Sequence, residues 1–385
     1  MRKYIFLSAC FIGIVLMFSS CKKDGIGNPD NSQVTYDAAY VVNGGSNSIS
    51  VINLETNKVE KTIDLASLTN NKGSDMMNMN MENMWPHHIY LSPDKSKLAI
   101  ALPGMDFSEG HNRIQDTLST GNFTDEHSQH HSNGTPNDMQ MQGKILVLDA
   151  VTGELLKELA LEGMTHNAVF SPDGKELWTA LMMTGGEVKV FDANTYQLIS
   201  TIPVGDMPAE VTFSSDGSKV FVANGMSNSV TVVDAANKHI LDTIEVGDDP
   251  VGAWPGMDGM MYVDNEEGQS ICIINSNNMM MMDTIHLGFM PGMVAQNNMM
   301  NEMWVSDPDG GKIHYWAIQD TGYVYGGAFE VGSGAHALAF TSNGATCYIT
   351  NQGEGTVSVA DVNNHQEKMK ITVGNKPNGM VIRYK

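Results

Sequence analysis

The sequence predicts an all-β protein built from one repeated unit of short strands. Three features support this: β-branched runs separated by Gly, Ser and Asn clusters, 38 glycines among 385 residues, and a turn pattern that returns about every 42 residues. The stretch 39–65 shows the unit most clearly, with three strand-like runs and two turns. Gly and Asn occupy those turns because they reach positive φ at the lowest cost.

Each repeat opens with Pro or a small residue, then continues with an apolar strand and a turn of the Ser-Pro-Asp-Gly kind. Successive openers are 79, 43, 42, 41, 44 and 42 residues apart. The first spacing exceeds the others by about one repeat length, which indicates an insertion. The openers are Pro86, Thr165, Pro208, Pro250, Pro291, Ala335 and Pro377.

Two further strands follow the turn in each repeat. The second strand is expected at 98–100, 177–179, 220–224, 261–265, 303–306 and 347–351. The third is expected at 144–149, 188–192, 230–234, 271–275 and 357–361. Each of these third strands ends in Asp or Asn, whose side chain is expected to cap the next turn, a structural role.

The runs at 40–43, 221–224 and 348–351 resemble the motif of the YVTN family of seven-bladed β-propellers, and the resemblance covers 34–385. It implies seven four-stranded antiparallel blades around a central channel. Six repeats start at Pro86, so we expect the seventh blade to combine strands from 39–65 with a last strand at 379–384. Such closure leaves no open edge between the first and last blade. The motif indicates the fold and not an activity.

The charge and the cysteines exclude several classes of function. A formal net charge of -22 argues against nucleic acid or an anionic membrane surface as a partner, because both require a basic face. It suits an envelope protein or one that attracts cations. Cys272 and Cys347 lie in strand-like runs of different repeats, and buried free thiols are favoured over a disulfide between them. The sequence has no CxxC motif, so neither covalent haem nor a zinc ribbon is supported.

The first 20 residues are typical of a lipoprotein signal peptide. Arg2 and Lys3 precede an apolar run at 4–18 that is too short to span a membrane and is followed by small residues. Cys21 follows and is expected to be acylated after cleavage, which would anchor the protein to a membrane. Residues 21–33 form a polar tether. We therefore expect a cell-envelope protein on the periplasmic or outer-membrane side, with an envelope protein as a candidate partner.

Methionine and histidine are concentrated in two inserts at about 67–85 and 103–142. The chain has 29 methionines, far above ordinary usage. Thioether sulfur is a soft ligand that suits Cu(I), and imidazole suits Cu(II), Zn and Ni, so copper is the expected cofactor. Drift of loop sequence and methionine packing are the alternatives. The candidate ligands of the inserts are Met76, Met77, Met79, Met81, Met84, His87, His88, His127, His130 and His131.

Alignment of the openers predicts a second set of ligands. The residues directly before and after each opener are expected where the innermost strands begin, around one mouth of the channel. Methionine and histidine recur there, so we expect a soft-metal site at this mouth, with a water-bonded lining as the alternative. The candidates are Met164, His166, Met207, Met290 and His336, together with His87.

Three functions compete at this point. The first is an envelope-anchored, non-catalytic propeller that holds or passes copper. The second is a metal-independent scaffold that binds another envelope protein or a glycan. The third is a propeller enzyme of the lactonase or lyase type, but no Ser/His/Asp order or pair of catalytic carboxylates stands out in the sequence, and the fold alone does not grant a function.

Overall fold

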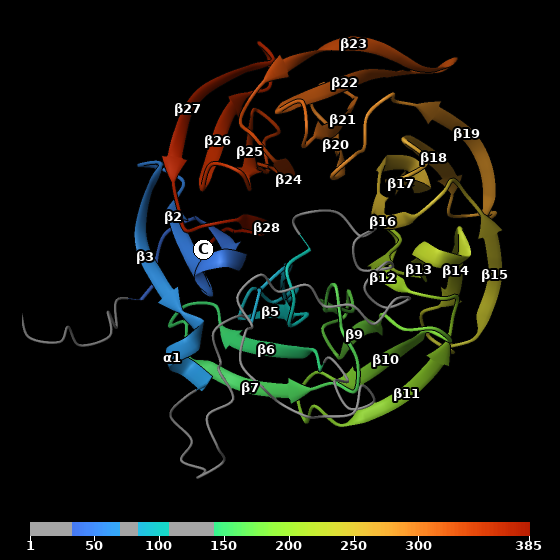
Figure 1. Ribbon diagram of the computed structural model, residues 1–385, viewed down its shortest axis with the longest axis horizontal. Coiled ribbons are helices and arrows are strands. Elements are labelled where there is room, and N and C mark those ends of the chain that lie inside the picture. Colours follow the sequence, from blue (N-terminus) through green and yellow to red (C-terminus); the bar gives the residue numbers. More distant parts are fainter. Residues whose placement is uncertain (1–32, 70–83, 108–141) are drawn as a thin grey trace, which may run out of the picture. The chain divides into compact units, whose positions relative to one another are not determined.

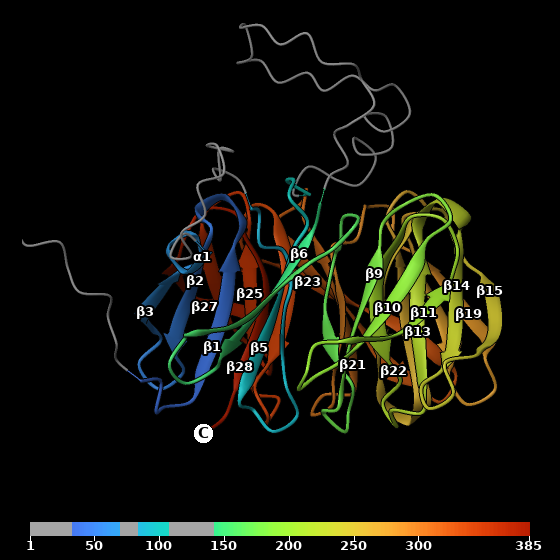
Figure 2. The same cartoon turned by 90° about the horizontal axis from the view of Figure 1, so that it is seen from below.

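The computed structural model describes residues 33–69, 84–107 and 142–385. Within them, 28 strands form seven four-stranded antiparallel sheets. The sheets are arranged as blades around a common axis (Figure 1). Figure 2 shows the ring from the side, with the C-terminus on the face opposite the helix α1 (Leu65–Thr69). The predicted seven-bladed β-propeller is thus confirmed.

The first four blades have the following strands, each set ordered from the axis outwards. The first blade contains β28 (Pro377–Arg383), β1 (Ala38–Asn43), β2 (Ser48–Asn53) and β3 (Lys58–Asp64). The second contains β4 (Ile89–Leu91), β5 (Lys97–Leu102), β6 (Lys144–Asp149) and β7 (Leu155–Ala160). The third contains β8 (Val169–Phe170), β9 (Glu176–Leu181), β10 (Glu187–Asp192) and β11 (Leu198–Pro203). The fourth contains β12 (Pro208–Phe213), β13 (Lys219–Asn224), β14 (Ser229–Asp234) and β15 (Ile240–Glu245).

The last three blades follow the same order. The fifth contains β16 (Pro250–Pro255), β17 (Met260–Asn265), β18 (Ser270–Asn275) and β19 (Met280–His286). The sixth contains β20 (Val294–Asn297), β21 (Glu302–Asp307), β22 (Lys312–Gln319) and β23 (Gly322–Glu330). The seventh contains β24 (Ala335–Phe340), β25 (Thr346–Asn351), β26 (Thr356–Asp361) and β27 (Gln366–Thr372). Three short 3-10 helices complete the described elements, η1 (Gly44–Ser46), η2 (Gly225–Ser227) and η3 (Met257–Gly259).

The first blade joins the two ends of the described chain. β28 pairs antiparallel with β1, with Tyr40 opposite Val381 and Ala38 opposite Arg383. The innermost strand of this blade therefore comes from the end of the sequence and the other three come from its beginning. This confirms the predicted closure, which leaves no unpaired strand edge between the first and the last blade.

The hydrophobic core is divided among the blade interfaces. Tyr40 and Leu98 pack between the first and second blades, and Val41 packs against Tyr348 between the first and seventh. Successive side chains of a strand point to opposite faces, and both faces of each blade are covered. The middle strands are therefore largely buried and mostly apolar, as in β1, whose six residues are all buried. β15 lies at the rim, where only Ile244 of its six residues is buried.

The turns confirm the predicted structural role of the closing Asp and Asn residues. The Oδ1 atom of Asp149 accepts hydrogen bonds from the backbone N–H groups of Val151 (2.8 Å) and Thr152 (2.7 Å). These side chains satisfy turn amides, which is a structural role. Cys272 and Cys347 are buried free thiols, as predicted, and burial raises the pKa of Cys347. In the part of the chain that is described, no helix has the length and apolar character to cross a membrane.

Helix α1 was not predicted. It occupies the beginning of the first insert, and Asp64 caps it by accepting a hydrogen bond from the Ala66 N–H at 3.0 Å. With five residues, the helix is too short for a periodic apolar pattern to reveal it in the sequence. Residues 70–83 and 108–141 of the two inserts lie outside the described residues.

Candidate metal centre

The site begins at a backbone turn in front of the innermost strands. The residue directly before the repeat opener has a positive φ in five blades: Trp85 (49°), Met207 (50°), Asp249 (53°), Lys376 (50°) and Gly334 (69°). A left-handed conformation costs a residue other than Gly about 1–2 kcal/mol. Such strain persists only where the surrounding structure imposes it, and it gathers at functional sites. In these five blades the shared turn brings the next residues to similar places near the axis, whereas Met164 and Met290, before the other two openers, do not have a positive φ.

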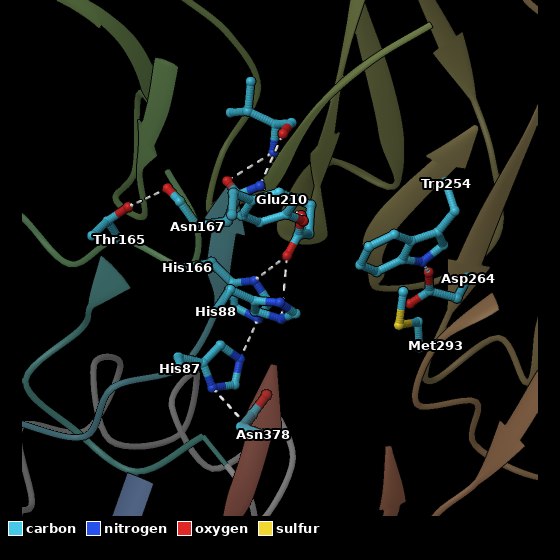
Figure 3. A network of polar contacts seen from close by, with 12 residues as sticks. His87, His88, Thr165, His166, Asn167, Glu210, Trp254, Asp264, Met293 and Asn378 are labelled. Atoms are coloured by element: carbon cyan, nitrogen blue, oxygen red, sulfur yellow. Dashed lines mark hydrogen bonds and ion pairs between the residues drawn. The ribbon is translucent and has the colours of Figure 1, made fainter. Parts of the chain in front are cut away.

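Three buried histidines converge at this end of the axis. The residues His87, His88 and His166 are 4%, 5% and 2% exposed. The Nε2 atoms of His87 and His166 are 2.9 Å apart (Figure 3). One ligating nitrogen from each of the three rings lies within 4.8 Å of the other two. These three residues are called the axial histidine site below.

The spacing of these nitrogens suits a shared ion. Two nitrogens that bind one metal at about 2.0–2.1 Å lie about 2.9–3.4 Å apart when the angle at the metal is about 90–110°. The Nε2 atoms of His87 and His166 are at the short end of this range, at 2.9 Å. Small movements of the rings would therefore place an ion between these two atoms.

Glu210 supports the axial histidine site from behind. The carboxylate is fully buried; its Oε1 lies 3.0 Å from Nδ1 of His166 and 3.3 Å from Nε2 of His88. Its Oε2 accepts hydrogen bonds from Asn167 Nδ2 (2.6 Å) and Tyr90 Oη (2.9 Å). A carboxylate that holds the second nitrogen of a ligating imidazole fixes the ring and makes it a better ligand. Burial, followed by the Glu210 carboxylate, raises the pKa of Tyr90 well above its usual range, so the hydroxyl keeps its proton.

The hydrogen-bond partners assign the tautomers of two rings. Asn378 donates from Nδ2 to Nδ1 of His87 at 2.8 Å, so the proton of neutral His87 lies on Nε2. That Nε2–H donates to Nε2 of His166, and His166 donates from Nδ1 to Glu210. An ion on His87 Nε2 would require this proton to move to Nδ1.

Asn378 can accommodate that change. Its Oδ1 atom is buried and has no hydrogen-bond partner among the described residues. A rotation of the amide by half a turn would direct Oδ1 at Nδ1–H of His87, so that the amide accepts this hydrogen bond. The buried amide therefore fits the metal-bound tautomer of His87 at least as well as the metal-free one.

The facing wall belongs to the fifth and sixth blades. Trp254 donates from Nε1 to Oδ1 of Asp264, and Met293 lies beside them (Figure 3). Burial, followed by the Glu266 carboxylate, raises the pKa of Asp264 well above its usual value. The ring centroid of Trp254 is 6.3 Å from that of His88. This wall and the axial histidine site thus carry different chemistry on opposite sides of the axis.

The structure brings some of the predicted ligands together. His336 is close to the site, with its ring centroid 6.2 Å from those of both His87 and His88. Met164 and Met207 pack with Met105, Met182 and Phe107 in one cluster, the axial methionine cluster. The Phe107 ring connects this cluster to the site, with its centroid 5.1 Å from that of His87 and 5.7 Å from that of His166.

Other predicted ligands lie elsewhere. Met84 is 8% exposed and packs in the core between the first and second blades, so it serves packing. Met290 is half-buried and does not belong to the axial methionine cluster. The remaining insert candidates lie outside the described residues: Met76, Met77, Met79, Met81, His127, His130 and His131. The anchor residue Cys21 lies outside them as well.

Asn167 and Glu210, which support the imidazoles, were not predicted from the sequence. The positions directly before and after each opener revealed His87, His166 and His336, and His88 was predicted only as a ligand from the first insert. The next position carries His88, Asn167 and Glu210 in three consecutive blades. This column of polar residues in otherwise apolar innermost strands was the signal that could have found them.

Comparisons with known proteins agree with the fold. No protein-family model matches the sequence, and no curated protein matches it. A protein of unknown function from Desulfotomaculum acetoxidans is 13% identical with a TM-score of 0.65, over 90% of this chain and 99% of that one. The periplasmic gluconolactonase PpgL of Pseudomonas aeruginosa is 16% identical with a TM-score of 0.63, over 90% and 98%. Hydrazine synthase of Kuenenia stuttgartiensis is 15% identical with a TM-score of 0.60, over 82% and 99%.

These identities are low enough that the similarity concerns the fold alone. The protein is a seven-bladed β-propeller with four-stranded blades, closed by strands from both ends of the described chain. Its function has to be argued from its own side chains, because this fold carries many unrelated functions.

Proposed function

We propose that this protein is a cell-envelope lipoprotein whose propeller binds copper at the axial histidine site, without catalysing a reaction. The observation that carries the proposal is the convergence of three buried imidazoles within 4.8 Å of one another. Imidazole binds copper, zinc and nickel. The axial methionine cluster beside it supplies soft thioethers, and these favour copper over the other two metals.

The surrounding residues support binding in specific ways. Glu210 holds His166 through Nδ1 and leaves Nε2 of that ring for an ion. The amide of Asn378 can accept a proton from Nδ1 of His87 when Nε2 of His87 binds metal. Because the three rings are almost fully buried, the site excludes water and is preorganised for its ligand. Copper bound there would accept electron density from the imidazole nitrogens.

Metal analysis of the full-length protein tests this function. Protein equilibrated with Cu(II) and then desalted is expected to retain copper, with nitrogen hyperfine structure in its electron paramagnetic resonance spectrum. The His87→Ala/His166→Ala variant is expected to lose one equivalent. His239→Ala is the matched control, since His239 is exposed in the turn between β14 and β15. Unchanged stoichiometry in the double variant would overturn the proposal, as would turnover of a lactone or sugar acid by metal-free protein.

The envelope location rests on residues 1–21, where a basic start and an apolar run precede Cys21. The test is metabolic labelling with a radioactive fatty acid in a Gram-negative host. The wild-type chain is expected to take up label and to sediment with membranes. Cys21→Ser is expected to do neither, while Cys347→Ser, which alters a buried thiol of the propeller, should leave both unchanged. An unlabelled, soluble wild-type protein would contradict the anchor.

A further inference from the structure

A cavity lies away from the axis, between the fifth and sixth blades. It has a volume of about 460 Å³ and is lined by residues of η3, β17 and β19 on one side and of β20, β22 and β23 on the other. Three methionines contribute to its wall: Met257, Met260 and Met282. We call it the thioether pocket.

The strand register explains why methionines of separate strands reach this pocket. Met260 and Tyr262 are two residues apart on β17, so they face the same side of the blade. Tyr262 pairs with Ile273, and Ile273 pairs with Asp283 on β19. The register then shifts, because the next residue of β18 pairs with Met281, and Met282 is the extra residue. This bulge turns Met282 towards the pocket that Met260 lines.

The pocket has a fixed polar floor. Gln296 accepts hydrogen bonds at Oε1 from the Met257 N–H (2.7 Å) and from the Tyr262 hydroxyl (3.1 Å). The Tyr323 hydroxyl donates to Tyr262 at 3.2 Å. Gly256 allows this close packing, since a Cβ there would lie 2.5 Å from the Tyr262 ring. The floor ties both blades together, while the methionine side chains above it remain adaptable.

Solvent access and charge indicate what the pocket accepts. Met257 is 40% exposed and Met282 is 56% exposed, so their thioethers can be reached from solvent. Among the described residues that line the pocket, none is Lys or Arg, whereas Asp283 and Asp320 are carboxylates. An acidic pocket favours a cation. Thioether sulfur is a soft ligand that selects Cu(I) over hard cations and stays unprotonated over a wide pH range.

We propose that the thioether pocket binds Cu(I) through Met257, Met260 and Met282. The proposal does not depend on the axial histidine site, which shares no residue with the pocket. It assigns binding of a reduced, soft ion to a place on the rim of the propeller that solvent reaches. No electron transfer is involved, since the ion enters and leaves as Cu(I).

Competition with a chromophoric Cu(I) chelator, bicinchoninate, under anaerobic conditions provides the test. The full-length protein carries His87→Ala/His166→Ala so that the axial histidine site does not contribute to Cu(I) binding. Adding Met257→Leu/Met260→Leu/Met282→Leu to this background is expected to remove one Cu(I) equivalent. Leucine keeps the volume and the apolar character, so packing is retained. Met226→Leu/Met369→Leu is the matched control, because both methionines are exposed on other blades, at 52% and 41%.

A second measurement identifies the ligands directly. Ag(I), a redox-stable probe for Cu(I), is titrated into protein labelled with ¹³C at the methionine methyl groups. The methyl resonances of Met257, Met260 and Met282 are expected to shift together. The Met257→Leu/Met282→Leu variant changes only exposed side chains. It can therefore be measured if the triple variant fails to fold. Full Cu(I) stoichiometry in the leucine variants, or shifts confined to Met226 and Met369, would overturn the proposal, whatever the result at the axial histidine site.

Discussion

The two sides of the propeller axis use the same repeat positions for different chemistry. At the second residue after the opener, the second, third and fourth blades carry His88, Asn167 and Glu210, whereas the fifth and sixth carry Gly252 and Met293. The difference lies in the side chains that this repeat position carries. It shows that polar groups near the axis come as a connected set, since each buried one needs a partner from a neighbouring blade.

The largest effect is expected when Glu210, the carboxylate shared by the polar residues of the second, third and fourth blades, is removed. Glu210→Ala would leave His88, Asn167, Tyr90 and His166 without their shared carboxylate. Loss of one partner from a buried ionic network costs about 3–5 kcal/mol. We expect a loss of unfolding free energy of this size in urea titrations. Glu245→Ala on the exposed rim strand should change it by less than about 0.5 kcal/mol, and equal effects of the two variants would refute the comparison.

The next test substitutes one tightly packed glycine on each side of the axis, Gly379 and Gly252. A Cβ at Gly379 would lie 2.8 Å from Cα of His88 and 2.9 Å from the His87 carbonyl oxygen. At Gly252 it would meet Trp254 Nε1 at 2.5 Å and Asp264 Oδ1 at 2.7 Å. We expect each Gly→Ala change to destabilise by about 1–3 kcal/mol in thermal unfolding.

Only Gly379→Ala is expected also to weaken copper binding, because it displaces the backbone of the histidines. Gly163→Ala is the control for both variants, since its Cβ would have no neighbour closer than 3.7 Å. Weaker copper binding in Gly252→Ala than in Gly379→Ala would show that the wall of Trp254 and Asp264 controls the site instead.

A smaller effect on stability is expected from Asp264, the carboxylic acid in the wall that faces the axial histidine site. Burial and then Glu266 raise the pKa of Asp264, so the folded protein holds this proton more tightly than the unfolded chain. The stability is therefore greatest below the unfolded pKa, near 3.8, and falls as the pH rises towards the folded pKa. Asp264→Asn keeps a hydrogen-bond acceptor for Trp254 and has no carboxyl group to ionise, so the fall in stability with rising pH should disappear.

We expect Asp264→Asn to be more stable than the wild type at pH 7, with a difference that shrinks towards pH 4, in urea unfolding across this range. Asp242→Asn on the exposed rim should show no such trend. A variant that is less stable than the wild type at pH 7 would mean that the charged form of Asp264 is the one the fold requires.

The smallest effect on stability is expected at the turn between β12 and β13, at the end of β12 opposite to Pro208 and the axial histidine site. The Ser214 hydroxyl, and then the Ser218 backbone N–H, lower the pKa of Asp216 to about 2. This contribution is present above the unfolded pKa and is lost as the pH falls from about 3.8 to about 2. Asp216→Asn should cost less than about 1 kcal/mol at pH 7 and flatten the acid limb of the stability profile, with copper binding unchanged.

The sequence predicted the fold more completely than the site. Repeat spacing predicted the number of repeats and the positions of most inner strands, because every blade obeys the same packing rule, and the family resemblance implied the seven-bladed ring and its closure. His87, His166 and His336 were found because they recur at one repeat position. Glu210 was missed because it belongs to a different column, and its importance depends on contacts between blades. Met84 looked like a ligand, but the blade interface buries it as a core residue. Side-chain neighbours of this kind depend on three-dimensional packing, which repeat spacing does not encode.

The closing strand β28 makes the order of chain synthesis matter. Asn378, beside His87, and Gly379, whose N–H donates to the His87 carbonyl oxygen at 2.8 Å, lie in β28, which follows all other described strands in chain order. A growing polypeptide therefore cannot complete the axial histidine site until β28 has been made. Loss of β28, by a premature stop codon or a protease, would remove the Asn378 contact to His87 and the ring closure in one event.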